Sequence, residues 1–158
     1  MNVIRRIIFF IFLSLLSSSV WAVSGFLKLN INGSVEASPC SINNGQTIDV
    51  DFNDVYIDKI EGEYYKRKID YNINCKSGGN PKFLMTFDGD RDGYYLKTNI
   101  DNLFVLFKNG NEDFNMGSGI AINYKTPPDI YAVLIKKKGA NLRSGEFYAH
   151  ATMKLMYL

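Results

Sequence analysis

The end of the chain alternates between an apolar set and a mostly polar set of side chains. After Gly145, every second position is apolar: Phe147, Ala149, Ala151, Met153, Leu155 and Tyr157. A period of two is typical of a β-strand with one buried face. We therefore expect a strand that runs from Gly145 to the C-terminus. It is either the last strand of a closed sandwich or a strand whose free edge pairs with another chain.

A second alternating segment lies near the N-terminus, between residues 23 and 35. Its inward positions would be Leu27, Leu29, Ile31, Gly33 and Val35. The Asn32–Gly33 pair is also typical of a two-residue hairpin turn, but the alternation continues in register through it. This favours one unbroken strand that contains a glycine.

Five segments between these two have the features of shorter strands. Three alternate with a period of two, at 46–52, 68–75 and 82–87, and two are apolar runs, at 103–107 and 130–135. Clusters of Gly, Pro, Asn and Asp separate them, and no segment shows a helical period. Short strands at this spacing predict an all-β protein with one β-sandwich domain.

Residues 1–22 have the features of a secretory signal peptide. Arg5 and Arg6 precede an apolar segment, Ile7–Leu16, and small residues lead to Ala22. The apolar segment is shorter than the roughly 20 residues that a membrane span needs. Cleavage after Ala22 would leave 136 of the 158 residues and lower the formal net charge from +2 to 0. The charge therefore gives no indication of a nucleic-acid partner.

The chain has two cysteines, Cys40 and Cys75. In an exported protein such a pair predicts one disulfide. It would close a loop of about 36 residues and stabilise the fold by about 3–4 kcal/mol.

No motif indicates catalysis, a cofactor or a metal site. The stretch Asp88–Gly93 fits only the front of a calcium-binding loop, because Asn99 stands where such a loop needs a glutamate. His150 is the single histidine, on the polar side of the last expected strand, and no serine has the surroundings of a nucleophile elbow. We expect neither an enzyme nor a small-molecule substrate.

Four features occur together in this chain. The first is the alternating arm with its glycine, and the second is the pair Pro39-Cys40 after it. The third is the segment Val50–Gly62, followed by an expected strand that ends at Cys75. The fourth is the C-terminal segment, in which Gly145 is the fourteenth residue from the end and Tyr157 is penultimate. In this combination the chain resembles the subunits of pili that a periplasmic chaperone and an outer-membrane usher assemble, of the type 1 and P pilus kind. The resemblance covers nearly all of the chain after residue 22.

The resemblance implies an incomplete immunoglobulin-like β-sandwich that lacks its seventh strand. In that family a chaperone lends a strand, and the N-terminal arm of the next subunit then replaces it by donor strand exchange. Carried over here, residues 23–35 are the donor arm and residues 36–158 the pilin domain. The donor residues would be Leu27, Leu29, Ile31, Gly33 and Val35, with Gly33 where the acceptor leaves no room for a side chain. The acceptor groove would be lined by Gly145, Phe147, Ala149, Ala151, Met153, Leu155 and Tyr157, and the chaperone would hold the carboxylate of Leu158.

The implied partners are a periplasmic pilus chaperone, an outer-membrane usher and neighbouring subunits of a cell-surface pilus. The length leaves no room for the second, sugar-binding domain of an adhesin. Ten tyrosines and eleven phenylalanines, in place of the alanine and threonine of major subunits, favour a minor tip or adaptor subunit over a major rod pilin. A different class of protein stays open: a closed, secreted sandwich that binds glycans, with Tyr94 and Tyr95 in a loop stacking on sugars.

Overall fold

The computed structural model describes residues 29–33, 40–76 and 81–158. The chain divides into two units, Met1–Glu36 and Ala37–Leu158. In the first unit, residues 29–33 form no strand, and the side chains of Leu29 and Ile31 are 74% and 85% exposed. The expected signal peptide and two expected donor residues, Leu27 and Val35, lie outside the described residues.

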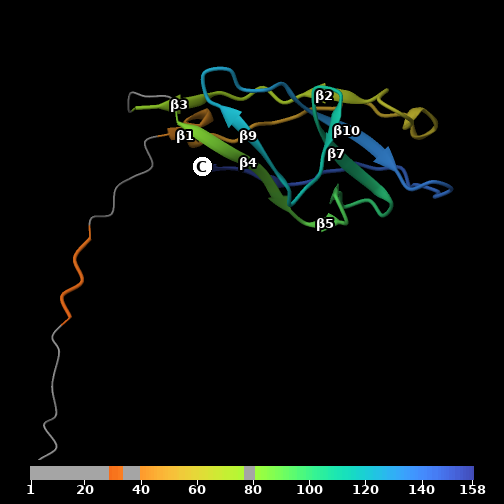
Figure 1. The fold of residues 1–158 in the computed structure, drawn as a ribbon. Coiled ribbons are helices and arrows are strands. Elements are labelled where there is room, and N and C mark those ends of the chain that lie inside the picture. The colour runs from red at the N-terminus through yellow and green to blue at the C-terminus, as the bar shows by residue number, and fades with distance from the viewer. Residues whose placement is uncertain (1–28, 34–39, 77–80) are drawn as a thin grey trace, which may run out of the picture. The chain divides into compact units, whose positions relative to one another are not determined.

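The larger sheet of the second unit has six strands (Figure 1). Their order is β2-β10-β7-β6-β5, and β8 also pairs with β7. Every pairing is antiparallel. The strands are β2 (Lys66–Lys68), β5 (Arg91–Asp92), β6 (Tyr95–Lys97), β7 (Leu103–Asn109), β8 (Glu112–Phe114) and β10 (Ile130–Lys136).

The smaller sheet has three strands in the order β11-β4-β9. These are β4 (Lys82–Gly89), β9 (Gly119–Asn123) and β11 (Ala151–Tyr157), and both pairings are antiparallel. A separate two-stranded ladder joins β1 (Cys40–Ile42) to β3 (Ile73–Cys75). Two 3-10 helices, η1 (Asn43–Gly45) and η2 (Ile57–Lys59), complete the described elements. Neither is long and apolar enough to cross a membrane.

The core lies between the two sheets. The smaller sheet contributes alternate residues of β4, and the larger sheet contributes alternate residues of β7 and β10. The rings of Phe87 in β4 and Phe107 in β7 stack with centroids 4.1 Å apart and planes at 8°. The two sheets therefore pack face to face as a sandwich. The core side chains of these strands are Phe83, Met85, Phe87, Leu103, Val105, Phe107, Ile130, Ala132 and Leu134.

The strands predicted at 82–87, 103–107 and 130–135 are confirmed as β4, β7 and β10. Three other predictions were wrong in extent. Segment 46–52 belongs to no strand, segment 68–75 is divided between β2 and β3, and the last strand begins at Ala151 and not at Gly145. A period of two reports which side chains are buried, whereas a strand also needs a hydrogen-bonded partner.

The region between β4 and β7 also differs from expectation. The stretch from Asp88 to Gly93, which follows the strand expected at 82–87, contains the end of β4 and all of β5. Tyr95, expected in a loop, is the first residue of β6. These strands are short and mostly exposed, so that they leave no burial pattern in the sequence.

Candidate functional site

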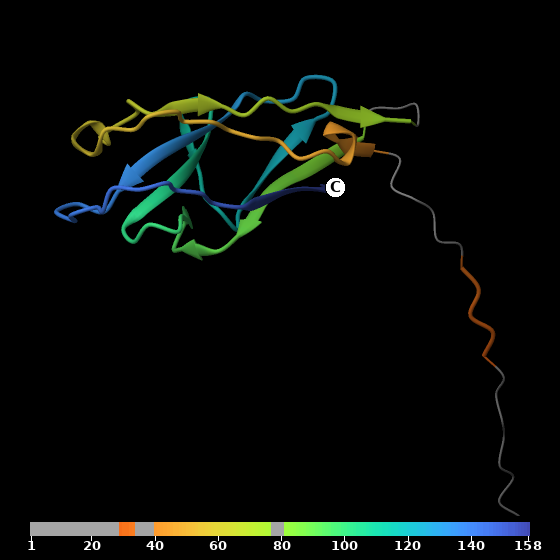
Figure 2. The same cartoon turned by 180° about the vertical axis from the view of Figure 1, so that it is seen from behind.

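A groove runs along one side of the last strand. Residues 147–153 form one wall and residues 45–52 the other, and the volume between them is about 840 Å³. Seen from behind, in Figure 2, these two segments run side by side, one orange and one dark blue. The floor consists of core side chains from both sheets, Phe87, Leu96, Val105, Phe107 and Ala132, and of Ile69, which follows β2. The groove is therefore an opening onto the hydrophobic core.

A second cavity of about 870 Å³ continues this groove at one end. Its walls are segments 50–57 and 142–148, and Ile60, Ile100 and Leu103 lie beneath them. Both cavities share residues 50–52 and 147–148. Residue numbers rise along one wall while they fall along the other, so the two walls run antiparallel.

One aromatic pair bridges the groove where the two cavities meet. The rings of Phe52 and Phe147, one from each wall, have centroids 6.0 Å apart and planes tilted by 50°. Both residues line both cavities. The pair therefore belongs to the lining that the two cavities share.

Within the described residues, no strand pairs with the groove side of either wall. Strand β11 pairs with β4 from Ala151–Gly89 to Tyr157–Phe83, and no described strand pairs with its other edge. Segment 46–52 also joins no ladder within the described part of the chain. Unpaired backbone N–H and C=O groups at a sheet edge are a template for a further strand.

The residues expected to line the acceptor fall into two groups. Phe147, Ala149, Met153 and Leu155 are half-buried and pack against the core. Ala151 is exposed, and Tyr157 and Leu158 are 51% and 68% exposed. Gly145 has a φ of +144°, a conformation that disfavours other residues, and it lies within the wall of the second cavity.

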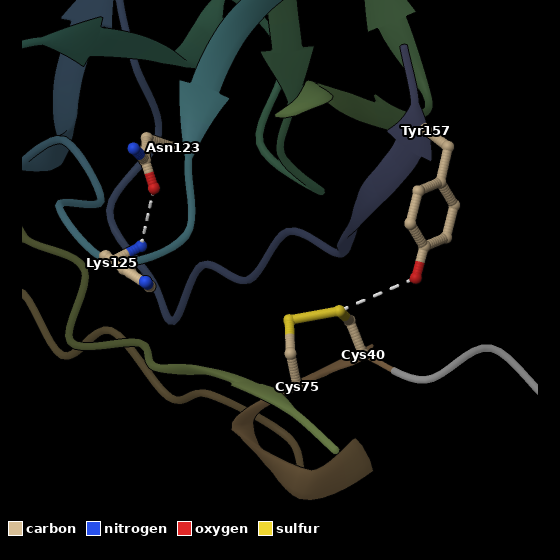
Figure 3. The surroundings of a disulfide bond; sticks show 5 residues. All are labelled: Cys40, Cys75, Asn123, Lys125 and Tyr157. Atoms are coloured by element: carbon tan, nitrogen blue, oxygen red, sulfur yellow. Dashed lines mark hydrogen bonds between the residues drawn. A yellow bond between two sulfur atoms is a disulfide. The ribbon is translucent and has the colours of Figure 1, made fainter. Parts of the chain in front are cut away.

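The predicted disulfide between Cys40 and Cys75 is confirmed. It joins β1 to β3 at directly paired positions. In Figure 3 the hydroxyl of Tyr157 points toward it and donates a hydrogen bond to Sγ of Cys40 at 3.6 Å. The backbone N–H of Leu158 donates to the carbonyl of Lys82 at 3.1 Å. The first bond ties the end of β11 to β1, and the second ties it to the start of β4.

The groove contains no arrangement typical of a catalytic or metal site. No group of His, Cys, Asp or Glu among the described residues could hold a metal ion. A strongly shifted carboxyl lies outside both cavities: hydrogen bonds from Lys108 and Lys66 lower the pKa of Glu63 to about 2. Lys108 is buried and also pairs with Asp113 at 3.3 Å. This cluster is an ion-pair network on the larger sheet.

Sequence reasoning missed half of the groove. It assigned the acceptor to the last strand, whereas residues 45–57 form the opposite wall. The signal for part of this wall was present, because Ile48, Val50 and Phe52 alternate. Asn99, whose hydrogen bonds hold segment 146–148, was noted only as a mismatch to a calcium loop. No periodicity points to a single polar residue in a turn.

The comparisons with known proteins agree on one family. The family model described as "Fimbrial protein" matches residues 29–158. The chain is 28% identical to the uncharacterized fimbrial-like protein YfcQ of Escherichia coli K12, over 92% of this chain and 97% of that protein. It is 30% identical to the minor fimbrial protein PrsF of Escherichia coli, over 93% of this chain and 96% of that protein.

Two solved structures share the fold. The P pilus adaptor subunit PapF aligns with a TM-score of 0.53 at 23% identity, over 76% of this chain and 96% of that chain. The P pilus rod subunit PapA aligns with a TM-score of 0.54 at 22% identity, over 76% of this chain and 99% of that chain. The described sandwich, whose sheets are not closed, is thus an incomplete immunoglobulin-like fold of the pilus-subunit kind. The chain belongs to the fimbrial protein family, a family of structural pilus subunits and not of enzymes.

Proposed function

We propose that the chain is a structural subunit of a chaperone–usher pilus and polymerises by donor strand exchange. The observation that carries this proposal is the open groove between β11 and segment 45–52, with core side chains as its floor. A strand inserted there would hydrogen-bond to the free edge of β11 and cover the core. It would supply the strand that the sandwich lacks.

The arm at residues 23–35 is the proposed donor, and residues 36–158 form the domain that accepts the arm of a neighbour. The large exposure of Leu29 and Ile31 supports this role, because both side chains are available for burial. Burying the four large apolar residues of the arm stabilises the complex by about 6–12 kcal/mol, at about 1.5–3 kcal/mol each. A whole domain is stable by only about 5–15 kcal/mol. The subunit would therefore depend on a strand lent by a periplasmic chaperone until a neighbour replaces it.

The glycine of the arm has a place in this arrangement. Since all ladders of the described sheets are antiparallel, a donor antiparallel to β11 is the simplest extension of the smaller sheet. Its C-terminal part, with Gly33 and Val35, then lies toward the Phe147 end of the groove. The rings of Phe52 and Phe147, with centroids 6.0 Å apart, line the groove there, and a side chain inserted at this point would meet them. A residue without a side chain fits this point.

The proposed position in the fibre is that of a minor tip or adaptor subunit. The relative PrsF is named a minor fimbrial protein and is 30% identical over nearly its whole length. The aromatic-rich composition agrees with this choice. The signal peptide at residues 1–22 would direct export, and an outer-membrane usher would place the subunit in a cell-surface pilus. This role is structural and needs no catalytic group, cofactor or small-molecule substrate.

Donor strand exchange can be tested with the substitution Ile31→Asp in the full chain, co-expressed with its periplasmic chaperone. The chaperone complex should form as in the wild type, because the chaperone strand occupies the groove and not the arm. Polymers, followed by size-exclusion chromatography, should be absent, since an aspartate buried at this position would be unpaired. Asn30→Asp is the matched control and should polymerise normally. Polymerisation of the Ile31→Asp chain at the wild-type rate would contradict the donor assignment.

A further inference from the structure

The wall of the groove extends beyond the ladder that holds the last strand. The pairing of β11 with β4 stops at Ala151, yet the wall continues back to residue 142. Among the described residues, four hydrogen bonds hold this unladdered part, and all of them involve Asn99. The backbone and side chain of Asn99 form these bonds with Arg143, Glu146 and Tyr148.

The contacts of Asn99 with Tyr148 are those that a residue of a paired strand would make. The backbone N–H of Asn99 donates to the carbonyl of Tyr148 at 3.1 Å, and Oδ1 of Asn99 accepts from the N–H of Tyr148 at 2.8 Å. Nδ2 of Asn99 donates to the carbonyl of Glu146 at 3.2 Å. One residue thus replaces the neighbouring strand that β4 does not provide here.

This pairing determines which backbone groups are available to a donor strand. Successive residues of an extended chain direct their N–H and C=O groups to opposite edges. Because Tyr148 is bonded to Asn99, the backbone groups of Phe147 and Ala149 are directed toward the groove. These are the groups with which an inserted strand would pair.

Asn99 itself is held firmly by the turn between β6 and β7. The hydroxyl of Thr98 accepts a hydrogen bond from the N–H of Ile100 at 3.1 Å and donates one to the carbonyl of Leu103 at 2.9 Å. The side chain of Ile100 is 4% exposed. Arg143 also donates from Nη2 to the carbonyl of Asn99 at 3.2 Å. Asn99 therefore ties a turn of the larger sheet to a wall that continues the smaller sheet.

We propose that Asn99 is a positioning residue for donor-strand capture, which sets segment 146–148 at the place where an incoming strand can pair with it. This inference rests on the proposed function, because it concerns the same groove. It assigns two of the four hydrogen bonds that hold the unladdered part of the wall to one side chain. Loss of that side chain should weaken capture of a donor strand without unfolding the sandwich, since the β4–β11 ladder is independent of it.

The test uses the full chain purified as a complex with its periplasmic chaperone. A fluorescent synthetic peptide of residues 24–35 is the probe, and its uptake and affinity are measured for Asn99→Ala, Asn99→Asp and Asn141→Ala. The side chain of Asn141 forms no hydrogen bond with any residue that the structure describes, so it is a matched control. Loss of two side-chain hydrogen bonds in Asn99→Ala should lower peptide affinity about tenfold. Asn99→Asp keeps the acceptor for Tyr148 and loses the donor to Glu146. Its peptide affinity should therefore lie between those of Asn99→Ala and Asn141→Ala.

Amide hydrogen exchange in the peptide-bound product separates positioning from general destabilisation. In Asn99→Ala the Tyr148 amide should lose its protection, whereas the amides of the β4–β11 ladder should keep theirs. Equal loss at both places would overturn the positioning role. If Asn99→Ala yields no complex with the chaperone, the test rests on Asn99→Asp. A peptide affinity of Asn99→Asp equal to that of Asn141→Ala overturns the inference, and a lower peptide affinity supports it.

The two proposals fail in different ways. Wild-type chain that takes up no peptide would contradict donor strand exchange, and the role of Asn99 with it. Wild-type chain that takes up the peptide while Asn99→Ala binds it as tightly as Asn141→Ala would overturn the role of Asn99 alone.

Discussion

Replacement of Ile31 by alanine in a donor strand should weaken its binding by an amount that follows from exposure. The side chain is 85% exposed in the arm, so nearly all of its surface can be buried in the groove. Full burial of an isoleucine contributes about 1.5–3 kcal/mol. Since alanine keeps one methyl group, we expect a loss of about 1–2.5 kcal/mol, or roughly 5- to 70-fold in an equilibrium constant.

The assay uses a single chain, so that the loss appears as a change in the free energy of unfolding. Residues 23–158 are followed by a flexible linker and a copy of residues 24–35, and the copy carries either Ile31→Ala or the control Asn30→Ala. Urea unfolding followed by circular dichroism gives the free energy of each form. Asn30→Ala should change it by less than about 0.5 kcal/mol, as for exposed polar residues generally.

Equal effects of the two substitutions would refute this reasoning. A larger effect of Asn30→Ala would show that the arm presents its other face to the groove, because a shift of one residue in register exchanges the two faces of a strand.

Three further predictions concern the same strand-complemented chain in urea unfolding. Joint replacement of Cys40 and Cys75 by alanine should remove about 3–4 kcal/mol, because the disulfide restricts the unfolded chain. Phe107→Ala should cost about 3–5 kcal/mol, since it empties a stacked position of the core. Because hydrogen bonds lower the pKa of Glu63 from 4.5 to about 2, its pairing with Lys108 stabilises the fold above about pH 4.5, and this contribution is lost as the pH falls toward 2. Glu63→Gln should therefore reduce the fall of the urea midpoint between pH 5 and pH 2.

Each of these has an outcome that contradicts it. Unchanged unfolding in the absence of the disulfide would mean that β1 and β3 stay paired without it. A cost below about 1 kcal/mol for Phe107→Ala would be inconsistent with a close-packed core. An identical decline with pH in the wild type and Glu63→Gln would show that the ion pair does not persist in solution.

The strands that the sequence predicts best have a clear apolar pattern and pair with other strands of the same chain. Strands β4, β7 and β10 bury alternate or continuous apolar residues and pair over most of their length. Segments 46–52 and 145–150 show the same alternation and form no ladder. In the proposed function the reason is physical, because the strand that pairs with both belongs to another subunit.

The remainder of the site depends on contacts that leave no pattern. The disulfide followed from the cysteine count and the expected export. The role of Asn99 could not be predicted, because it acts through hydrogen bonds to residues 44 to 49 positions away. The ring contact between Phe52 and Phe147 likewise could not be predicted from the sequence. Each residue taken alone is an ordinary apolar position of an alternating segment.

The central claim is that the sandwich is incomplete without a donor strand. The most direct measurement compares thermal melts of oxidised residues 23–158 with those of the same chain carrying the linker and the copy of residues 24–35 after Leu158. We expect a cooperative transition only in the strand-complemented form, because only there is the groove floor covered. A cooperative transition in the plain chain, as a monomer, would contradict the account and show that the last strand has its partner within its own domain.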